Sequence, residues 1–233
     1  FAHEAGICTD HAIRRDDRTL GLYVISLEAG ERSFSYWRGN SAARTLADDP
    51  EALAVALADS DLVYFSGITL GILDQAARDR LLAGIRIVKT GGTLVVFDPN
   101  LRPKLWPDAD TMTKAVSQAA EVSSIVLPSF EDEQVHFGDT SPDATIARYL
   151  GAGATSVVVK DGSNAISYVH HEAMGRVEIE AVTDIVDTTA AGDSFNAGFL
   201  ASLNANADMP TAIARGAGLA RHVIGSRGAL VPL

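Results

Sequence analysis

Residues 187–198 read DTTAAGDSFNAG and carry the clearest chemistry of this 233-residue chain. Hydroxyl side chains are followed by three very small residues at 190–192 and then by Asp193, just where an apolar helical pattern begins. A helix start offers unpaired N–H groups and the positive end of the helix dipole, which together attract anions. The small residues leave this backbone open to a phosphoryl group.

A carboxylate in the same turn suggests general base catalysis. Asp193 could accept a proton from a substrate hydroxyl while the neighbouring N–H groups stabilise charge on the transferring oxygens. Asp193 could instead serve only as a favourable acid at a helix start. The predicted catalytic turn consists of Ala190, Ala191, Gly192 and Asp193.

Two other phosphate-binding patterns do not fit. The sequence has no G-x-x-x-x-G-K-[ST] motif, which excludes a P-loop nucleotidase. The GAGA at 151–154 lies between a predicted helix and a strand, the reverse of the order in a dinucleotide fingerprint. It is better read as a turn that ends a helix.

The elements around this turn predict an α/β fold. Four short runs rich in Val, Ile and Leu, at 61–67, 93–100, 123–129 and 155–162, alternate with helical stretches. Such runs are typical of a doubly wound, mostly parallel sheet covered by helices on both faces. Ligands bind beyond the carboxyl ends of such strands, so the polar residues that end the runs should form a rim.

Two further segments complete the predicted architecture. Residues 20–39 form two β-rich runs around EAGE, in which Gly30 can supply a turn, and predict a hairpin. Residues 165–169 and 176–182 predict a terminal antiparallel pair. We expect one domain over 1–233, with the 20–39 hairpin as a lid.

Composition and charge narrow the partners. The net charge of −11, with 19 Lys and Arg spread along the chain, argues against nucleic-acid and membrane surfaces. The single cysteine, Cys8, excludes an internal disulfide and fits a cytoplasmic protein. His170 and His171 lack spaced ligand partners and predict exposed histidines rather than a metal site.

DTTAAGDSFNAG strongly resembles the C-terminal signature of the ribokinase-like carbohydrate kinases. The resemblance implies that residues 190–193 form an anion hole and that Asp193 is the catalytic base. Some family members have Gly where this chain has Ala190. Members usually begin with a further strand–helix segment, so the resemblance predicts that this chain is N-terminally incomplete.

Three more stretches, at 21–44, 97–106 and 126–133, are similar to 2-keto-3-deoxygluconate kinases. The similarity implies ATP-dependent phosphorylation of the terminal hydroxyl of that keto acid, giving 2-keto-3-deoxy-6-phosphogluconate. It also implies sugar-acid contacts from a set of lid and rim residues. That set is Tyr23, Tyr36, Arg38 and Arg102, with Asp193.

The carboxylate of such a substrate is a further reason to expect arginines in the site, because a guanidinium can bind a carboxylate through two parallel hydrogen bonds. Arg38 and Arg102 would then determine the substrate class. The alternatives are an exposed lid charge at Arg38, and an Arg102 that pairs with Asp98 or Asp108.

For the nucleotide the family implies ATP with Mg²⁺. In place of the usual N-x-x-E motif this chain has Ser129 and Asp132. Asp187 and Thr189 resemble positions that bind a monovalent cation, although Asp187 could equally cap the turn. The implied ATP-binding residues are Ser129, Lys160, Gly162, Gly225 and Gly228.

Two other functions remain open from the sequence. One is a neutral-sugar kinase of the fructokinase or ribokinase type, and the other is a catalytically incomplete fragment derived from a kinase. The sequence does not decide between the gluconate and galactonate epimers. Apolar Leu22, Val24 and Trp37 predict a hairpin face that could pack on a second subunit.

Overall fold

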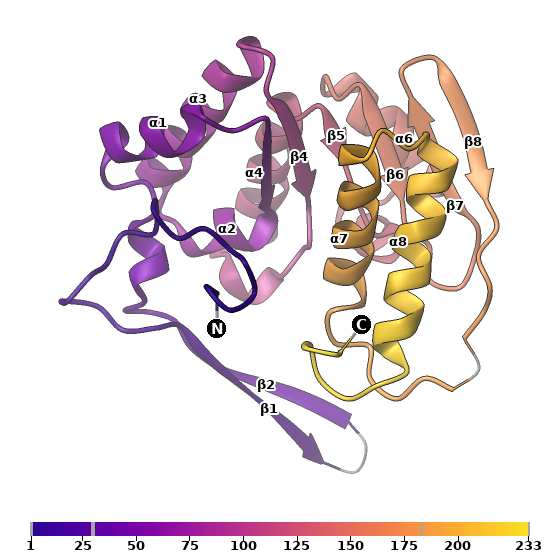
Figure 1. Ribbon diagram of the computed structural model, residues 1–233, viewed down its shortest axis with the longest axis horizontal. Coiled ribbons are helices and arrows are strands. Elements are labelled where there is room, and N and C mark those ends of the chain that lie inside the picture. Colours follow the sequence, from indigo (N-terminus) through magenta and orange to yellow (C-terminus); the bar gives the residue numbers. More distant parts are fainter. Residues whose placement is uncertain (1, 29–30, 183, 233) are drawn as a thin grey trace. The chain divides into compact units, whose positions relative to one another are not determined.

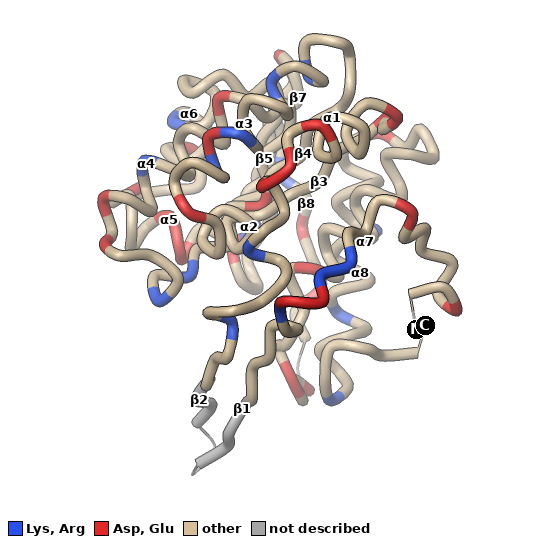
Figure 2. The backbone as a smooth tube through the Cα atoms, turned by 90° about the vertical axis from the view of Figure 1, so that its left-hand side faces the viewer, with Lys and Arg blue, Asp and Glu red and all other residues tan. Residues whose placement is uncertain are grey.

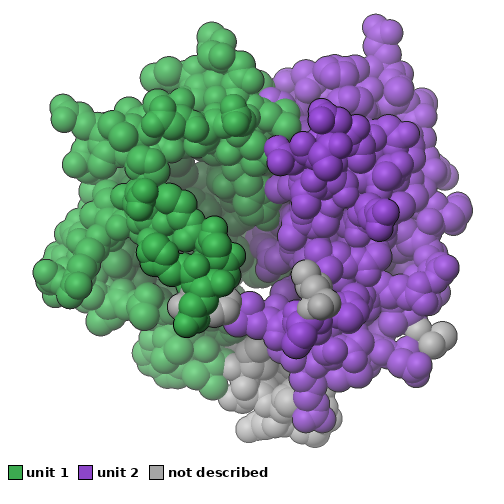
Figure 3. Space-filling model, in the orientation of Figure 1, with its two compact units in different colours: residues 1–97, 101–123 green, residues 98–100, 124–233 purple. Residues whose placement is uncertain are grey.

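The computed structural model describes residues 2–28, 31–182 and 184–232. The chain divides into two compact units, one of residues 1–97 with 101–123 and one of residues 98–100 with 124–233 (Figure 3). Each unit contains both strands and helices, so each is built as layers of packed secondary structure.

Unit 1 begins with an antiparallel hairpin, in which β1 (Leu22–Glu28) pairs with β2 (Glu31–Trp37). The predicted turn at Gly30 lies outside the described residues. The strands β3 and β4 follow and are separated by helices (Figure 1). The remaining elements of this unit are η1 (Ala42–Thr45), α1 (Pro50–Ala58), β3 (Leu62–Ser66), α2 (Gly67–Ile72), α3 (Gln75–Thr90), β4 (Leu94–Asp98), η2 (Pro103–Leu105) and α4 (Ala109–Glu121).

Unit 2 contains four strands in the order β5-β6-β7-β8. β5 pairs with β6 in parallel, and the two following pairs are antiparallel. Its elements are β5 (Ile125–Val126), α5 (Phe130–Phe137), α6 (Pro142–Gly151), β6 (Ser156–Val159), β7 (Ile166–His170), β8 (Ala173–Val177), α7 (Ala191–Asn204) and α8 (Met209–Ile224). Alternating strands and helices with fully buried β4 and β6 residues confirm the predicted α/β class.

The last strand lies earlier than the sequence predicted. Residues 176–182 were expected to form it, but β8 spans Ala173–Val177. His171 adopts a positive φ of 51° and, with Glu172, closes a two-residue turn directly after β7. Left-handed backbone at a residue other than glycine is uncommon, so the residue types at 171–172 do not indicate so short a turn.

His170 also differs from the prediction of an exposed histidine. It ends β7, is half-buried, and its Nδ1 lies 2.8 Å from the Ser156 hydroxyl on β6. His171 is exposed, as predicted. Within the described residues no group of three or more His, Cys, Asp or Glu side chains could hold a metal ion.

The helices α7 and α8 lie side by side in unit 2 (Figure 1). Two glycines make their close approach possible. A Cβ at Gly198 would lie 3.0 Å from the Arg215 carbonyl oxygen, and one at Gly216 would lie 2.7 Å from the Phe195 carbonyl oxygen. The start of α7 is therefore held by close packing against α8.

Charged residues of both signs are mixed along the described chain, and its helices do not have the hydropathy of membrane spans. Figure 2 shows Lys and Arg intermixed with Asp and Glu along the backbone. None of the helices in the described ranges is both long and apolar enough to traverse a membrane.

Candidate active site

Helix α7 differs from most of the other helices in its N-cap residue. α1, α3, α4, α6 and α8 each begin at an Asp or Ser whose side chain accepts a backbone N–H. α7 begins at Ala190, and no side chain caps it. A helix start of this kind presents backbone N–H groups and the positive end of the helix dipole, which together attract an anion. Residues 190–193 are called the anion turn below.

The anion turn requires unusual backbone at its first residue. Ala190 has φ 61° and ψ 13°, in the left-handed region that favours glycine. The Ser194 N–H donates to the Ala190 carbonyl at 2.8 Å and starts the helix. This conformation gives a physical reason for the Gly that the resemblance implied at this position in other members.

We expect Ala190→Gly to stabilise the folded chain by about 0.5–1 kcal/mol. Glycine relieves the left-handed strain of about 1–2 kcal/mol, and the greater entropy of the unfolded chain offsets part of that gain. Urea unfolding checks the free energy, with Ala197→Gly in the middle of α7 as the control. That control should destabilise the chain, and a loss of stability at position 190 would contradict the strain argument.

The carboxylate of Asp187 anchors the segment that precedes the anion turn. One oxygen accepts the Thr189 N–H at 2.7 Å and the other accepts the Gly228 N–H at 3.0 Å. The N–H groups of Val186 and Asp187 donate to the Ile224 carbonyl. Asp187 thus caps the turn, as one reading of the sequence expected, and ties it to the predicted nucleotide-binding residues after α8.

Asp193 lies in the first turn of α7, and its side chain is exposed. An exposed carboxylate at a helix start can receive a proton from a hydroxyl that approaches an anion bound there. Asp193 therefore lies in the first turn of a helix, where the sequence predicted a helix start.

Two predicted nucleotide-binding residues lie side by side at the ends of neighbouring strands. Ser129 and Lys160 form a parallel β-bridge that continues the pairing of β5 and β6. Ser129 is also the residue before α5, and its side chain makes no capping hydrogen bond. Gly162 follows with φ 56°, and Gly228 has φ 87°, so both use backbone that favours glycine. Gly225 ends α8 with ordinary helical φ.

A buried polar network that the sequence did not predict lies behind the anion turn. The Asn196 amide donates to Asp98 Oδ2 at 2.8 Å, and Lys160 Nζ donates to Asn196 Oδ1 at 3.3 Å. Lys160 Nζ also lies 3.7 Å from Asp98 Oδ1. Asn196 is 2% exposed and Asp98 is 4% exposed. Their polar atoms therefore form hydrogen bonds with one another and with Lys160 in place of hydrogen bonds with water.

The signal for this network was a polar residue on an apolar helix face. Asn196 lies next to Phe195 in the pattern that predicted α7, and Asp98 ends an apolar strand. A buried amide needs partners, but nothing in the sequence says that they come from positions 98 and 160.

In unit 1 the hairpin brings together three predicted sugar-acid ligands. Tyr23 and Tyr36 are directly paired across the strands, with ring centroids 6.3 Å apart. The Arg38 guanidinium lies 5.4 Å from the Tyr23 ring centroid and 4.7 Å from that of Tyr36. Stacking on two aromatic faces orients the planar guanidinium and leaves its edge N–H groups available.

The fourth predicted ligand, Arg102, precedes η2 and is exposed. Its Nη1 donates to the Leu101 carbonyl at 2.7 Å. The two acids that the sequence offered as partners of Arg102 have other partners. Asp108 caps α4, and Asp98 accepts from Asn196 and lies near the Lys160 ammonium.

The turn that carries Arg102 packs on the helices of unit 1. A Cβ at Gly71 would lie 2.9 Å from the Leu105 Cβ, so α2 approaches this turn closely. Buried Arg78 stacks on Trp106 with its guanidinium 5.0 Å from the ring centroid, and it donates to carbonyls at the end of α2. The backbone at Arg102 is thereby fixed.

A second buried network supports α5. Glu133 is fully buried and accepts from Arg148 at 2.6 Å and from the Tyr149 hydroxyl at 2.9 Å. Asp139 accepts from the same guanidinium at 2.7 Å. Burial raises the pKa of Glu133 to about 7, although Arg148 and Tyr149 act in the opposite direction.

Glu133 should make folding stability fall as pH rises. Its folded pKa of about 7 lies above the ordinary 4.5, so its contribution is complete below pH 4.5 and is lost as pH rises through 7. The free energy of unfolding should fall by roughly 3 kcal/mol at most over this pH range. Glu133→Gln should flatten this pH dependence in urea unfolding. Glu131→Gln, an exposed acid on the same helix, should keep the wild-type slope, and equal slopes in both variants would contradict the assignment.

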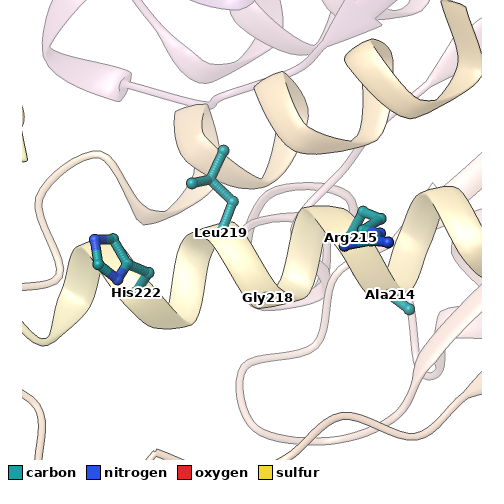
Figure 4. Close-up of a pocket in the computed structure, with 5 residues that line it drawn as sticks. All are labelled: Ala214, Arg215, Gly218, Leu219 and His222. Carbon is teal, nitrogen blue, oxygen red and sulfur yellow. The ribbon is translucent and has the colours of Figure 1, made fainter. Parts of the chain in front are cut away.

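A hollow of about 380 Å³ in unit 2 lies along α8 (Figure 4). Its lining residues all come from that one helix, which makes it a surface hollow rather than an enclosed site. The lining residues are Ala214, Arg215, Gly218, Leu219 and His222.

Comparison with solved structures defines the class of the fold. A PfkB protein from Polaromonas sp. JS666 matches with a TM-score of 0.82 and 25% identity, over 96% of this chain and 73% of that one. A fructokinase with bound ATP from Xylella fastidiosa matches in fold with a TM-score of 0.84 and 23% identity, over 98% of this chain and 74% of that one. The chain therefore has the ribokinase-like α/β fold, as its sequence predicted.

The sequence defines the family. The model of the pfkB family of carbohydrate kinases matches residues 2–233. A 2-dehydro-3-deoxygluconokinase of Dickeya dadantii is 39% identical over 98% of this chain and 76% of its own length. The chain belongs to the pfkB carbohydrate kinase family, which confirms the resemblance drawn from DTTAAGDSFNAG.

Proposed function

We propose that this carbohydrate kinase phosphorylates the terminal hydroxyl of 2-keto-3-deoxygluconate with ATP. The observation that carries the proposal is the 39% identity to a 2-dehydro-3-deoxygluconokinase over nearly the whole chain. The stacked Arg38 on the hairpin supports a substrate that bears a carboxylate.

In the proposed reaction the substrate hydroxyl oxygen attacks the γ-phosphorus of ATP. A new O–P bond forms, the bond between that phosphorus and the bridging oxygen breaks, and ADP leaves with the electron pair. The hydroxyl proton passes to the Asp193 carboxylate. The products are 2-keto-3-deoxy-6-phosphogluconate and ADP.

The anion turn would stabilise the transferring group. The start of α7, which has no side-chain cap from Ala190, would present backbone N–H groups to the phosphoryl oxygens, where charge develops. Gly192 carries no side chain, so an oxygen can approach the backbone closely.

The nucleotide would lie along the glycine-bearing loops of unit 2. We assign Ser129, Lys160, Gly162, Gly225 and Gly228 to ATP. Asp187 links the anion turn to Gly228, so the phosphate end and these loops are held together. Asp187 and Thr189 could also contact a monovalent cation.

Mg²⁺ is expected to enter with ATP. It keeps several waters and prefers phosphate and carboxylate oxygens, so it needs only one or two protein ligands. Asp132 in the first turn of α5, half-buried and near Ser129, has the donor chemistry for this role. The metal would neutralise phosphate charge.

The sugar acid would be bound by Tyr23, Tyr36, Arg38 and Arg102. We propose that the hairpin acts as the lid of a single kinase domain and excludes water from the reaction. The exposed apolar residues of its other face, Leu22, Val24 and Trp37, would pack on a second copy of the chain.

A substrate panel tests the proposal. ADP release is measured with ATP, Mg²⁺ and, in turn, 2-keto-3-deoxygluconate, its galactonate epimer, fructose and ribose. We expect kcat/KM for the keto acids to exceed that for the neutral sugars by at least about tenfold, the equivalent of one charge-assisted contact. Preference for fructose or ribose would favour a neutral-sugar kinase, and no turnover with any sugar would favour a catalytically incomplete chain.

A further inference from the structure

We propose that Asn196 is a positioning residue that, with Asp98, holds the Lys160 ammonium beside the anion turn. The inference rests on the proposed phosphoryl transfer and deepens it. It assigns a role to two residues that bind no substrate, and it explains how a lysine is kept next to a helix start.

The Lys160 ammonium lies close to the start of α7. A Cβ built on Gly192 would lie 3.9 Å from Lys160 Nζ, so the ammonium borders the second residue of α7. The Lys160 side chain is only 13% exposed. The Lys160 ammonium and the positive end of the α7 dipole therefore both favour an anion at this helix start.

Asp98 offsets the electrostatic cost of placing an ammonium at this helix start. The start of a helix carries partial positive charge and repels a cation, and burial adds a desolvation cost. Asp98, at 3.7 Å from Nζ, supplies the opposite charge that keeps the ammonium there. An arriving phosphoryl group would then meet a cation that is already in place, without the cost of reorganisation.

The amide of Asn196 suits both of its charged neighbours. A carboxylate can only accept hydrogen bonds and an ammonium can only donate them. The Asn196 amide donates to Asp98 and accepts from Lys160, so a single side chain satisfies both and fixes their separation. Asn196 lies one helical turn after Asp193, which links the placement of the cation to that of the proposed base.

A double-mutant cycle tests this assignment. Lys160→Met removes the charge but keeps the stem, Asn196→Leu removes the amide at similar volume, and the third variant carries both changes. Charge-assisted contacts of this kind imply a loss in kcat/KM for ATP of about 10- to 100-fold for Lys160→Met. We expect about tenfold for Asn196→Leu, and a double variant within about twofold of Lys160→Met.

The control is Ser167→Ala, a buried polar residue on β7 in the same unit, which should leave kcat/KM unchanged. If Asn196 acted independently of Lys160, the two single effects would multiply in the double variant. That multiplication would overturn the proposal, as would an Asn196→Leu variant with wild-type kinetics.

Asn196→Asp provides a readout that a structural role would not give. A protonated Asp can donate to Asp98 and accept from Lys160 as the amide does, whereas an ionised one can accept from Lys160 but cannot donate to Asp98. The activity of this variant relative to wild type should therefore rise as pH falls. A constant ratio would contradict the proposal.

Nucleotide binding separates this inference from the proposed function. If the wild-type chain does not phosphorylate the sugar acid, the proposed function fails. The affinity of a non-hydrolysable ATP analogue for the same four proteins, measured by calorimetry, still decides the role of Asn196. Equal affinity in wild type and both single variants would overturn it.

Discussion

Asp193→Asn is expected to lower kcat about 10²- to 10⁴-fold, with little change in KM for ATP or for the sugar acid. Asparagine has nearly the same size and keeps polar contacts, but it cannot take a proton from the substrate hydroxyl. Steady-state kinetics measure the loss, and calorimetric binding of ATP shows that the site is still formed.

The matched control is Asp143→Asn. Asp143 also lies in the first turn of a helix in unit 2, and its exposed carboxylate pairs with Arg176. Removing either acid from a helix start costs about 0.3–1 kcal/mol of stability, so unfolding should hardly distinguish the two variants. Only Asp193→Asn should lose activity. A kcat near wild type in that variant would show that Asp193 serves only the helix.

Much of the fold follows from local patterns in the sequence. The apolar runs at 61–67, 93–100, 123–129 and 155–162 each contain an observed strand, because strands that pack into a core need apolar residues. β8 was misplaced since its boundary depends on the left-handed conformation of His171, which residue type does not reveal.

In the candidate site, too, some features follow from local sequence and others depend on contacts between distant residues. The anion turn could be predicted because small residues, an acid and a helix start lie within twelve positions. The hydrogen bond between Asp98 and Asn196 joins residues 98 positions apart in the sequence. It forms because the fold of unit 2 brings Asp98, the last residue of β4, next to α7. Sequence patterns describe local periodicity and do not reveal such pairings.

Glu133 shows a second limit. In the sequence it is one of three acids in FEDE and looks solvated, yet it is fully buried. Its burial is compensated by Arg148 and Tyr149 from the next helix, whose contribution is visible only once α5 and α6 are packed.

Substrate selection by the two arginines is the other change with a large expected effect. We expect Arg38→Met with Arg102→Met to raise KM for 2-keto-3-deoxygluconate by about 10²- to 10³-fold, and each single change to raise it by about tenfold or more. Each guanidinium would contribute charge-assisted hydrogen bonds to the carboxylate. A neutral sugar lacks that carboxylate, so its kcat/KM should change little.

Arg38→Lys distinguishes geometry from charge. A lysine keeps the positive charge but loses the planar group that stacks on Tyr23 and Tyr36, so it should restore only part of the affinity. Arg86→Met, at an exposed ion pair on α3, is the control for loss of a surface charge from a chain of net charge −11. If the double variant lost keto acid and fructose turnover equally, the arginines would support the fold rather than select the acid. A selective loss would mean that the hairpin and the turn before η2 determine the substrate class, while the anion turn supplies the chemistry common to the family.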